Sequence, residues 1–447
     1  MRSVLTVCSV MALACLAGCG GGSTPSSTPP TLSVSQPPGP LSSESTEAAK
    51  LLASGKLSDA LAAATKGIEK SPQNATAYET RAAIQHKLGQ FDAAVEDFSR
   101  AIELDPQNAR LRNNRGFLWL SRQEFDKALA DFDAAIVLSP EYANAHNNRG
   151  LLHIAQGRYR QAVLDLNVAL KVDPNYVDAS NNRGFALMHL GVWDRALADF
   201  NRALTLNPQG VNSLANRGLV KLNLGDTAGA IIDFTEAMLL EPDNPNYYVH
   251  RREAYLREGA LDKAQQDAGK IELLQQVQVL SAAIAAQPAN PAGYIARGQF
   301  FRQQENYTRA REDYSRAIEV APQHVPARLE RAALLFDLKD YASAIADCEA
   351  VLAVERHQRA FSIRGDCRLE LQDFDGALAD FETAKRIDNK VAEAYLLKGE
   401  SLASQGKAQA AAAYTQKGES LVKQLEAAAE PDRKQAATLD LDVDEKL

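Results

Sequence analysis

The chain has 447 residues, of which 45% are hydrophobic and 24% charged, a globular composition with ample material for a core. Aromatic residues make up only 6%, which favours closely packed helices and argues against a β-rich fold. The formal net charge of -8 provides no electrostatic footprint for nucleic acid, so no nucleic-acid partner is expected.

The first segment of the chain has the features of a bacterial export signal. Arg2 precedes the apolar run Val4–Ala17, which is too short for a stable transmembrane helix. The sequence Leu16-Ala17-Gly18-Cys19 resembles the lipobox of bacterial lipoproteins. That resemblance implies that residues 1–18 are a signal peptide and that the Cys19 thiol carries a lipid. The alternative is an ordinary secretory signal that happens to contain a cysteine.

Residues 19–45 are rich in Gly, Ser, Thr and Pro, which predicts a flexible tether after the lipidated cysteine. Two or three acyl chains would hold the protein firmly on a membrane. The residue after the cysteine is Gly20 rather than Asp, which by the sorting rule of the lipoprotein family favours the outer membrane, if the cell has one. The expected location is therefore the cell envelope, as a membrane-anchored lipoprotein.

A 34-residue period organises the chain beyond the tether. Its clearest marker is a proline that recurs at Pro72, Pro106, Pro140, Pro174, Pro208 and Pro242, and again, after a slip of 12 residues, at Pro288 and Pro322. A period of this length is that of a helix–turn–helix repeat, and a proline ends each unit because it cannot continue a helix. The period predicts a stacked solenoid, a fold that mostly presents surface to partners.

Small and aromatic residues recur at fixed places in each repeat. In the repeat 109–142, Gly116 and Ala128 allow two helices to approach closely, and Trp119 and Phe132 fill the space between them. This pattern resembles the tetratricopeptide repeat family over about residues 41–424, some eleven repeats. The resemblance implies an all-α, right-handed α-solenoid whose first helices line a concave face. Glycines after the first helices are expected to act as C-caps, at Gly89, Gly157, Gly191, Gly225 and Gly259.

The slip in the period lies between Gly269 and Pro288. Apolar residues keep helical spacing across it, which predicts one long helix near 262–286, with a separate short helix as the alternative. The long helix would divide the array into a first block, 46–287, and a second block, 288–425, with a changed stacking angle. The acidic tail, 426–447, lacks an apolar stripe, and disorder is expected there.

Two charged columns depart from the usual pattern of the family. An Arg precedes the glycine position in nine successive repeats, and an Asp stands 16 residues later in the same nine. The members include Arg115, Arg149, Arg183 and Arg217, with Asp131, Asp165, Asp199 and Asp233. Because both columns stop at the same repeats, we expect bidentate Arg–Asp pairs within a repeat or between neighbours. Two unrelated columns of solvated charges are the alternative.

The first helices also carry asparagine pairs at 113–114, 147–148 and 181–182. They resemble the asparagine ladder with which the repeat superhelix of O-linked N-acetylglucosamine transferases holds a peptide backbone, although a structural bridge between helices is an open alternative. The candidate peptide-binding residues are Asn114, Asn148, Asn182 and Asn216, with Phe117, Leu151, Phe185 and Leu219 beside them. The apolar members could instead be buried between helices.

The sequence contains no Walker A loop, no His-Glu-x-x-His, no nucleophile elbow and, after Cys19, no Cys-x-x-Cys. No enzyme activity, cofactor, metal or small-molecule substrate is therefore expected. His146 and His153 share a helix face, but no nearby carboxylate completes metal-ligand spacing. Cys348 stands at the repeat position that elsewhere holds Phe132 or Phe200, the aromatic column, and is expected to be buried. A disulfide with Cys367 is an open alternative.

These features predict a scaffold that captures a protein or peptide partner of unknown identity on its concave face and is attached to the membrane through Cys19. A passive structural spacer in the envelope and an enzyme of unrecognised kind are the other classes considered.

Overall fold

The computed structural model describes the backbone of residues 43–444 and the side chains of residues 47–428. Within that range the regular elements are 22 helices, and no strand is present. The predicted all-α repeat solenoid is confirmed. The predicted signal peptide, Cys19 and nearly all of the tether lie outside the described residues. No helix of the described part combines the length and apolar character needed to cross a membrane.

The internal contacts divide the chain into an N-terminal unit, residues 1–275, and a C-terminal unit, residues 276–447. The helices of the N-terminal unit are α2 (Ser43–Ala53), α3 (Leu57–Lys70), α4 (Ala75–Lys87), α5 (Phe91–Leu104), α6 (Ala109–Ser121), α7 (Phe125–Leu138), α8 (Ala143–Ala155), α9 (Tyr159–Val172), α10 (Val177–His189), α11 (Trp193–Leu206), α12 (Val211–Leu224), α13 (Thr227–Leu240) and α14 (Pro245–Arg257). The boundary between the units falls within α15 (Leu261–Ala286). The C-terminal unit continues with α16 (Pro291–Gln303), α17 (Tyr307–Val320), α18 (Val325–Asp337), α19 (Tyr341–Leu352), α20 (Gln358–Glu370), α21 (Phe374–Thr383), α22 (Asn389–Ser404) and α23 (Ala408–Asp444).

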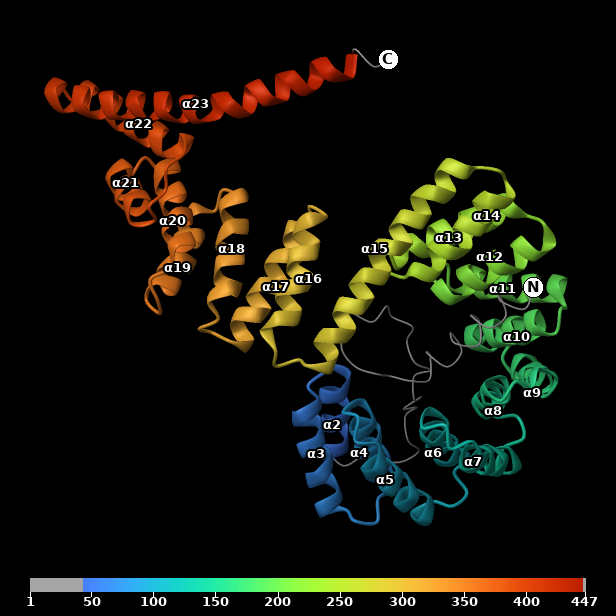
Figure 1. The fold of residues 1–447 in the computed structure, drawn as a ribbon. Coiled ribbons are helices and arrows are strands. Elements are labelled where there is room, and N and C mark those ends of the chain that lie inside the picture. Colours follow the sequence, from blue (N-terminus) through green and yellow to red (C-terminus); the bar gives the residue numbers. More distant parts are fainter. Residues whose placement is uncertain (1–42, 445–447) are drawn as a thin grey trace. The chain divides into compact units, whose positions relative to one another are not determined.

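In the N-terminal unit the helices pack in antiparallel pairs that follow one another in chain order along a curved path (Figure 1). Local sequence fixes where the first helix of a pair begins. The Asn74 and Asn108 side chains accept a hydrogen bond from the backbone N–H two residues later, at 3.0 and 3.2 Å. The five predicted C-cap glycines end their helices in the left-handed region, with φ between 71° and 87°.

Buried side chains fill the space within each helix pair and continue into the next pair. Gly218 of α12 lies against the ring of the fully buried Phe234 of α13, and a Cβ on the glycine would stand 2.7 Å from that ring. Ala230 and Ala237 of α13 are also fully buried. The glycine thus lets two helix backbones approach with an aromatic ring between them, as the sequence pattern predicts.

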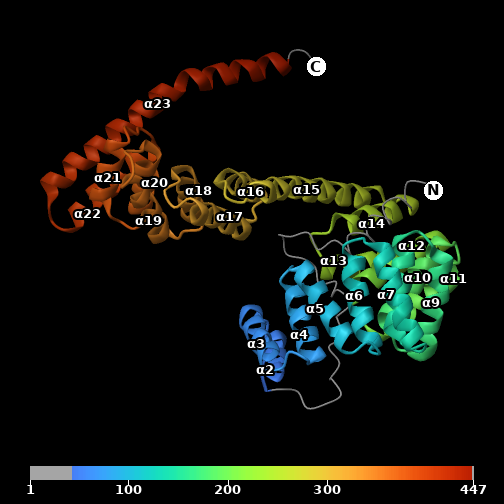
Figure 2. The same ribbon diagram turned by 90° about the horizontal axis from the view of Figure 1, so that it is seen from below.

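The C-terminal unit repeats this plan with changed residues in the aromatic column. Phe381 keeps the usual Phe, whereas Tyr314 in α17 and Cys348 in α19 replace it, and both are fully buried. At the end of the unit, α22 packs along the first part of α23, which continues beyond it (Figure 2).

The long helix expected from the sequence is present, whereas the expected disorder of the tail is not found over its described part. The long helix expected near 262–286 is one continuous element, Leu261–Ala286, so the separate short helix is excluded. The disorder expected for 426–447 is a wrong prediction over its helical part, because α23 runs on to Asp444. The strong helix formers of α23 lie mainly before Pro431, whereas Pro431 and the four Asp residues after it have low helix propensity, so propensity alone does not account for the last part of the helix.

Candidate binding surface on the first helices

The predicted Arg–Asp pairs form in all nine repeats, each within its own repeat. In every pair the Arg Nε and one terminal nitrogen donate to the two carboxylate oxygens of the Asp, at 2.6–3.0 Å. The carboxylates are nearly buried, and Asp233 keeps 1% of its side-chain surface. Side-on bidentate geometry of this kind joins the two helices of a repeat with fixed orientation.

A third bond, not anticipated from the sequence, ties seven of these arginines to the preceding helix pair. The remaining terminal nitrogen donates to a polar side chain 16 residues earlier, at 2.7–3.1 Å. The acceptors are Ser99, Asp133, Asn167, Asn201, Thr235, Ser281 and Ser315. Each of these arginines therefore bridges its own first helix to two second helices, which sets the spacing of successive repeats.

The asparagines form a hydrogen-bonded ladder across the first helices of the N-terminal unit. Asn182 of α10 donates to Asn147 of α8 at 3.0 Å, and Asn148 of α8 donates to Asn113 of α6 at 2.9 Å. Asn114 continues the ladder to Glu79 of α4 at 3.3 Å. The Glu79 carboxylate also binds Arg110 at 2.7 Å. Burial is the largest influence on Glu79 and raises its carboxyl pKa.

The candidate asparagines differ in how far they are buried. Asn114 and Asn148 are 3% and 6% exposed, and their carboxamides bond within the ladder, so the structural alternative holds for both. Asn182 and Asn216 are half-buried, and the Asn182 NH2 group also donates within the ladder, to Asn147. The ladder thus fixes the spacing of α6, α8 and α10 and leaves its later members accessible.

The apolar candidates also divide by burial. Phe117 and Leu219 are buried, at 6% and 4% exposure, and so belong chiefly to the core. Leu151 and Phe185 are half-buried on α8 and α10. These two side chains, together with Asn182 and Asn216, are the part of the predicted site that a partner can reach.

Phe185 lies in an aromatic cluster that enlarges this accessible surface. The His189 ring lies 4.5 Å from the Phe185 ring and stacks on Tyr159 of α9, with centroids 4.4 Å apart. Burial lowers the pKa of His189, so its imidazole is neutral at neutral pH. The cluster is therefore an uncharged aromatic patch.

Carboxylate and histidine side chains come together at a place where the sequence suggested none. Asp165 of α9 lies 3.3 Å from His146 Nδ1 and 3.6 Å from His153 Nε2, both on α8. The sequence statement that no carboxylate accompanies these histidines is thus corrected. Arg149 already occupies both oxygens of Asp165, however, and no group of three side chains suited to a metal ion occurs among the described residues.

The two cysteines of the repeats are free thiols and are buried, so the disulfide alternative is not realised. Cys348 and Cys367 belong to different core clusters, and burial raises the pKa of each thiol to about 12. Both side chains act as small apolar core residues, as the position of Cys348 in the aromatic column suggests.

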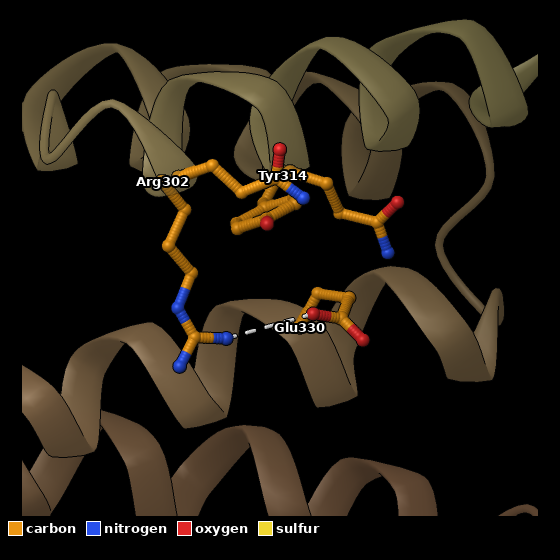
Figure 3. A pocket seen from close by; sticks show the side chains of 5 residues that line it. Arg302, Tyr314 and Glu330 are labelled. Atoms are coloured by element: carbon orange, nitrogen blue, oxygen red, sulfur yellow. Dashed lines mark ion pairs between the residues drawn. The ribbon is translucent and has the colours of Figure 1, made fainter. Parts of the chain in front are cut away.

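The C-terminal unit has a pocket on its first helices that sequence reasoning missed. It has a volume of about 540 Å³ and is lined by Gln299, Arg302 and Gln303 of α16, Tyr314 of α17 and Glu330 of α18. Figure 3 shows the Arg302 and Glu330 side chains pointing toward one another, with Tyr314 above the line that joins them. The signal available in the sequence was the replacement of the columnar Phe by Tyr, which adds a hydroxyl to a buried position.

Known proteins resemble this chain either in the sequence of a short segment or in the fold. For 93 residues the chain is 32% identical to RNA polymerase II-associated protein 3 of Xenopus tropicalis. The matched stretch is 21% of this chain and 14% of that relative, so the chain spans a small part of the relative's length.

Among solved structures, a tetratricopeptide repeat protein from Parabacteroides merdae has a TM-score of 0.41 and 23% identity, and the match covers 51% of this chain and 91% of that one. The PilF protein of Pseudomonas aeruginosa has a TM-score of 0.43 and 19% identity, over 48% of this chain and 96% of that one. At these scores the similarity carries no argument about function.

Family models give the assignment. Models described as tetratricopeptide repeats match residues 147–211, 211–244, 277–325, 295–360, 329–392 and 364–420. A further model, described as a TPR repeat, matches residues 84–120 and 119–157. Because these segments together cover residues 84–244 and 277–420, well over half of the sequence, the chain belongs to the tetratricopeptide repeat family.

Proposed function

We propose that this protein is an interaction scaffold that holds an extended protein segment along the first helices α8, α10 and α12. The observation that supports this proposal is a set of half-buried apolar side chains, Leu151 and Phe185, on neighbouring first helices. The bond from Asn182 to Asn147 joins α10 to α8, and the bond from Ser213 to Asn181 joins α12 to α10, so these helices keep a fixed spacing. A rigid surface loses little conformational entropy when it binds a segment, which favours affinity.

The accessible carboxamides give the same surface a means of binding a peptide backbone. Asn182 and Asn216 are half-buried beside the apolar side chains. A carboxamide both donates and accepts, which matches the donor and acceptor of a peptide unit. Apolar residues of the segment would lie against the aromatic patch around Phe185, and its backbone would bond to these asparagines.

The test is site-specific photo-crosslinking in intact cells. A benzoylphenylalanine probe replaces Phe185, and a control probe replaces Leu164, an apolar residue of α9 that is 68% exposed. We expect a discrete protein to be captured from position 185 and not from 164. Equal capture from both positions would mean general stickiness. No capture from either would favour the passive spacer over the scaffold.

We also propose that the scaffold is held at the bacterial envelope by a lipid on Cys19. The support is the resemblance of residues 16–19 to a lipobox, together with the tether-like composition of residues 19–45. Metabolic labelling with an alkyne fatty acid tests this: wild-type protein should incorporate the label and Cys19→Ala should not. Equal labelling of the two proteins would refute lipidation at this residue.

A further inference from the structure

Among the described residues, the aromatic column contains several fully buried rings, and only the ring of Tyr314 carries a hydroxyl. Phe occupies the equivalent place at 98, 132, 200, 234 and 381. The Tyr314 ring fits as these rings do, since a Cβ on Gly298 would stand 2.7 Å from it. The hydroxyl is thus an addition to a core that packs equally well with Phe.

The Tyr314 hydroxyl is buried, and among the described residues it has no hydrogen-bond partner. An unpaired buried hydroxyl is unfavourable relative to one that makes a hydrogen bond. Burial raises the pKa of this phenol to about 12, so it is protonated at neutral pH and able to donate. Tyr314 lines the pocket on α16 and α18 (Figure 3), and because its hydroxyl has almost no exposed surface, a ligand reaches it when a neighbouring side chain moves aside.

The charges around the pocket are balanced. Arg302 pairs with Asp337 at 2.6 Å, and Glu330 pairs with Arg359 at 2.7 Å through its Oε1 atom. The other oxygen of Glu330, Oε2, lies 3.7 Å from Arg302 and accepts no hydrogen bond from the described residues. A charged ligand group would lose its hydration here without gaining an unpaired counter-charge.

Two groups therefore lack a hydrogen bond. One is the Tyr314 phenol, which can donate, and the other is Glu330 Oε2, which can accept. A primary carboxamide satisfies both, because its C=O accepts while its N–H donates. At the mouth of the pocket, Gln299 and Gln303 are exposed and have no side-chain hydrogen bond among the described residues, so they are free to move aside.

We propose that this pocket receives the side-chain carboxamide of a Gln or Asn residue in a bound protein segment. The carboxamide C=O would accept from the Tyr314 hydroxyl, and its N–H would donate to Glu330 Oε2. The inference rests on the proposed scaffold function in taking the ligand to be part of a protein segment.

The experiment titrates the full-length protein with small probes while the side-chain amide signals of Gln299 and Gln303 are followed by NMR. The probes are N-acetylglutamine methylamide, the corresponding glutamate and lysine compounds, and methyl glucoside. We expect saturable shifts with the glutamine probe and at least tenfold weaker binding of both charged probes. Tyr314→Phe should weaken the glutamine probe about fivefold, the loss expected for one hydrogen bond.

Tyr314→Phe is a matched variant because Phe is the usual residue of this column, and we expect it to fold and to raise the unfolding midpoint. Equal binding of the glutamine probe by both proteins would overturn the proposal, as would saturation by no probe or by the glucoside alone. Because the probes are free compounds and the pocket is in the C-terminal unit, failure here is distinguishable from failure of the crosslinking test at Phe185.

Discussion

At the scale of single residues, the clearest feature is an ion pair repeated nine times in the same geometry. In the pair of Arg183 and Asp199, the carboxylate keeps 8% of its side-chain surface and the guanidinium 20%. Desolvation of such a pair offsets much of its Coulomb attraction, so its main effect is to fix orientation. Removing one partner of the pair should destabilise the fold strongly, since the remaining charge is left buried and unpaired.

Asp199→Ala should therefore lower the free energy of unfolding of the N-terminal unit by about 3 kcal/mol. The measurement is the urea midpoint followed by circular dichroism. The matched control is Glu103→Ala, which breaks the exposed pair with Arg100 and should change stability by less than about 1 kcal/mol. Equal losses of unfolding free energy in the two variants would show that burial of the Asp199 pair does not affect stability.

A second residue-scale prediction concerns acid. Burial lowers the pKa of His250, with Glu253 opposing weakly, so the folded protein prefers the neutral imidazole. An unfolded histidine titrates near 6.5, hence this contribution to stability is complete above about pH 6.5 and declines as the pH falls below it. Asn occupies the equivalent position as Asn182 and Asn216, which makes His250→Asn a conservative change.

We expect the fall in unfolding midpoint between pH 7.5 and pH 5.5 to be smaller in His250→Asn than in the wild type. Part of the fall should persist, because burial also lowers the pKa of His86, His153 and His189. Identical pH profiles for wild type and variant would contradict this assignment.

At the scale of helices, close approach within a pair depends on glycine. Gly218 of α12 touches the ring of Phe234, which is fully buried and cannot move away. In contrast, Gly269 of α15 is exposed, and a Cβ there would meet nothing within 4 Å. The two glycines lie in the same unit and differ in what surrounds them.

Gly218→Ala should cost about 1–3 kcal/mol through overpacking. Gly269→Ala should instead stabilise the chain by about 0.5–1 kcal/mol, because alanine loses less backbone freedom in a helix. Thermal unfolding of the two variants beside wild type checks the signs. A stabilised Gly218→Ala would mean that α12 and α13 can separate without loss.

At the scale of the whole molecule, the repeated arginine bridges and the ladder make each repeat interchangeable with its neighbours. Deleting residues 143–176 joins two repeats of the same pattern, and Asn182 would then meet Asn113 in place of Asn147. Stability in such arrays is approximately a sum of repeat and interface terms.

We expect this deletion to keep the helical content per residue and to lower the unfolding midpoint only modestly. Deleting the half-repeat 143–159 is the control, and it should abolish cooperative unfolding, because two second helices would become neighbours. Circular dichroism melts of the two proteins provide the comparison. Equal loss of structure in both would contradict interchangeable repeats.

The sequence by itself determined the helix pairs and the positions of the Arg and Asp columns, and the structure decided that each Arg pairs with the Asp of its own repeat. These features depend on contacts within one repeat, such as the 16-residue separation of Arg183 and Asp199, and so leave a periodic trace. The tail is the exception, since disorder was expected there and α23 continues to Asp444 past Pro431.

Only the tertiary structure decided how the repeats join. The third arginine bond always falls 16 residues earlier, but its acceptors differ as much as Ser99 and Asn167, so no column of one residue type marks them in the sequence. The Asn182–Asn147 bond joins two repeats, and the asparagine pairs alone also left a peptide-binding role open. In the same way, the Tyr314 hydroxyl reveals its lack of a partner only when α16, α17 and α18 are packed around it. The physical reason is that burial and pairing are properties of packed neighbours, which the order of residues along the chain does not specify.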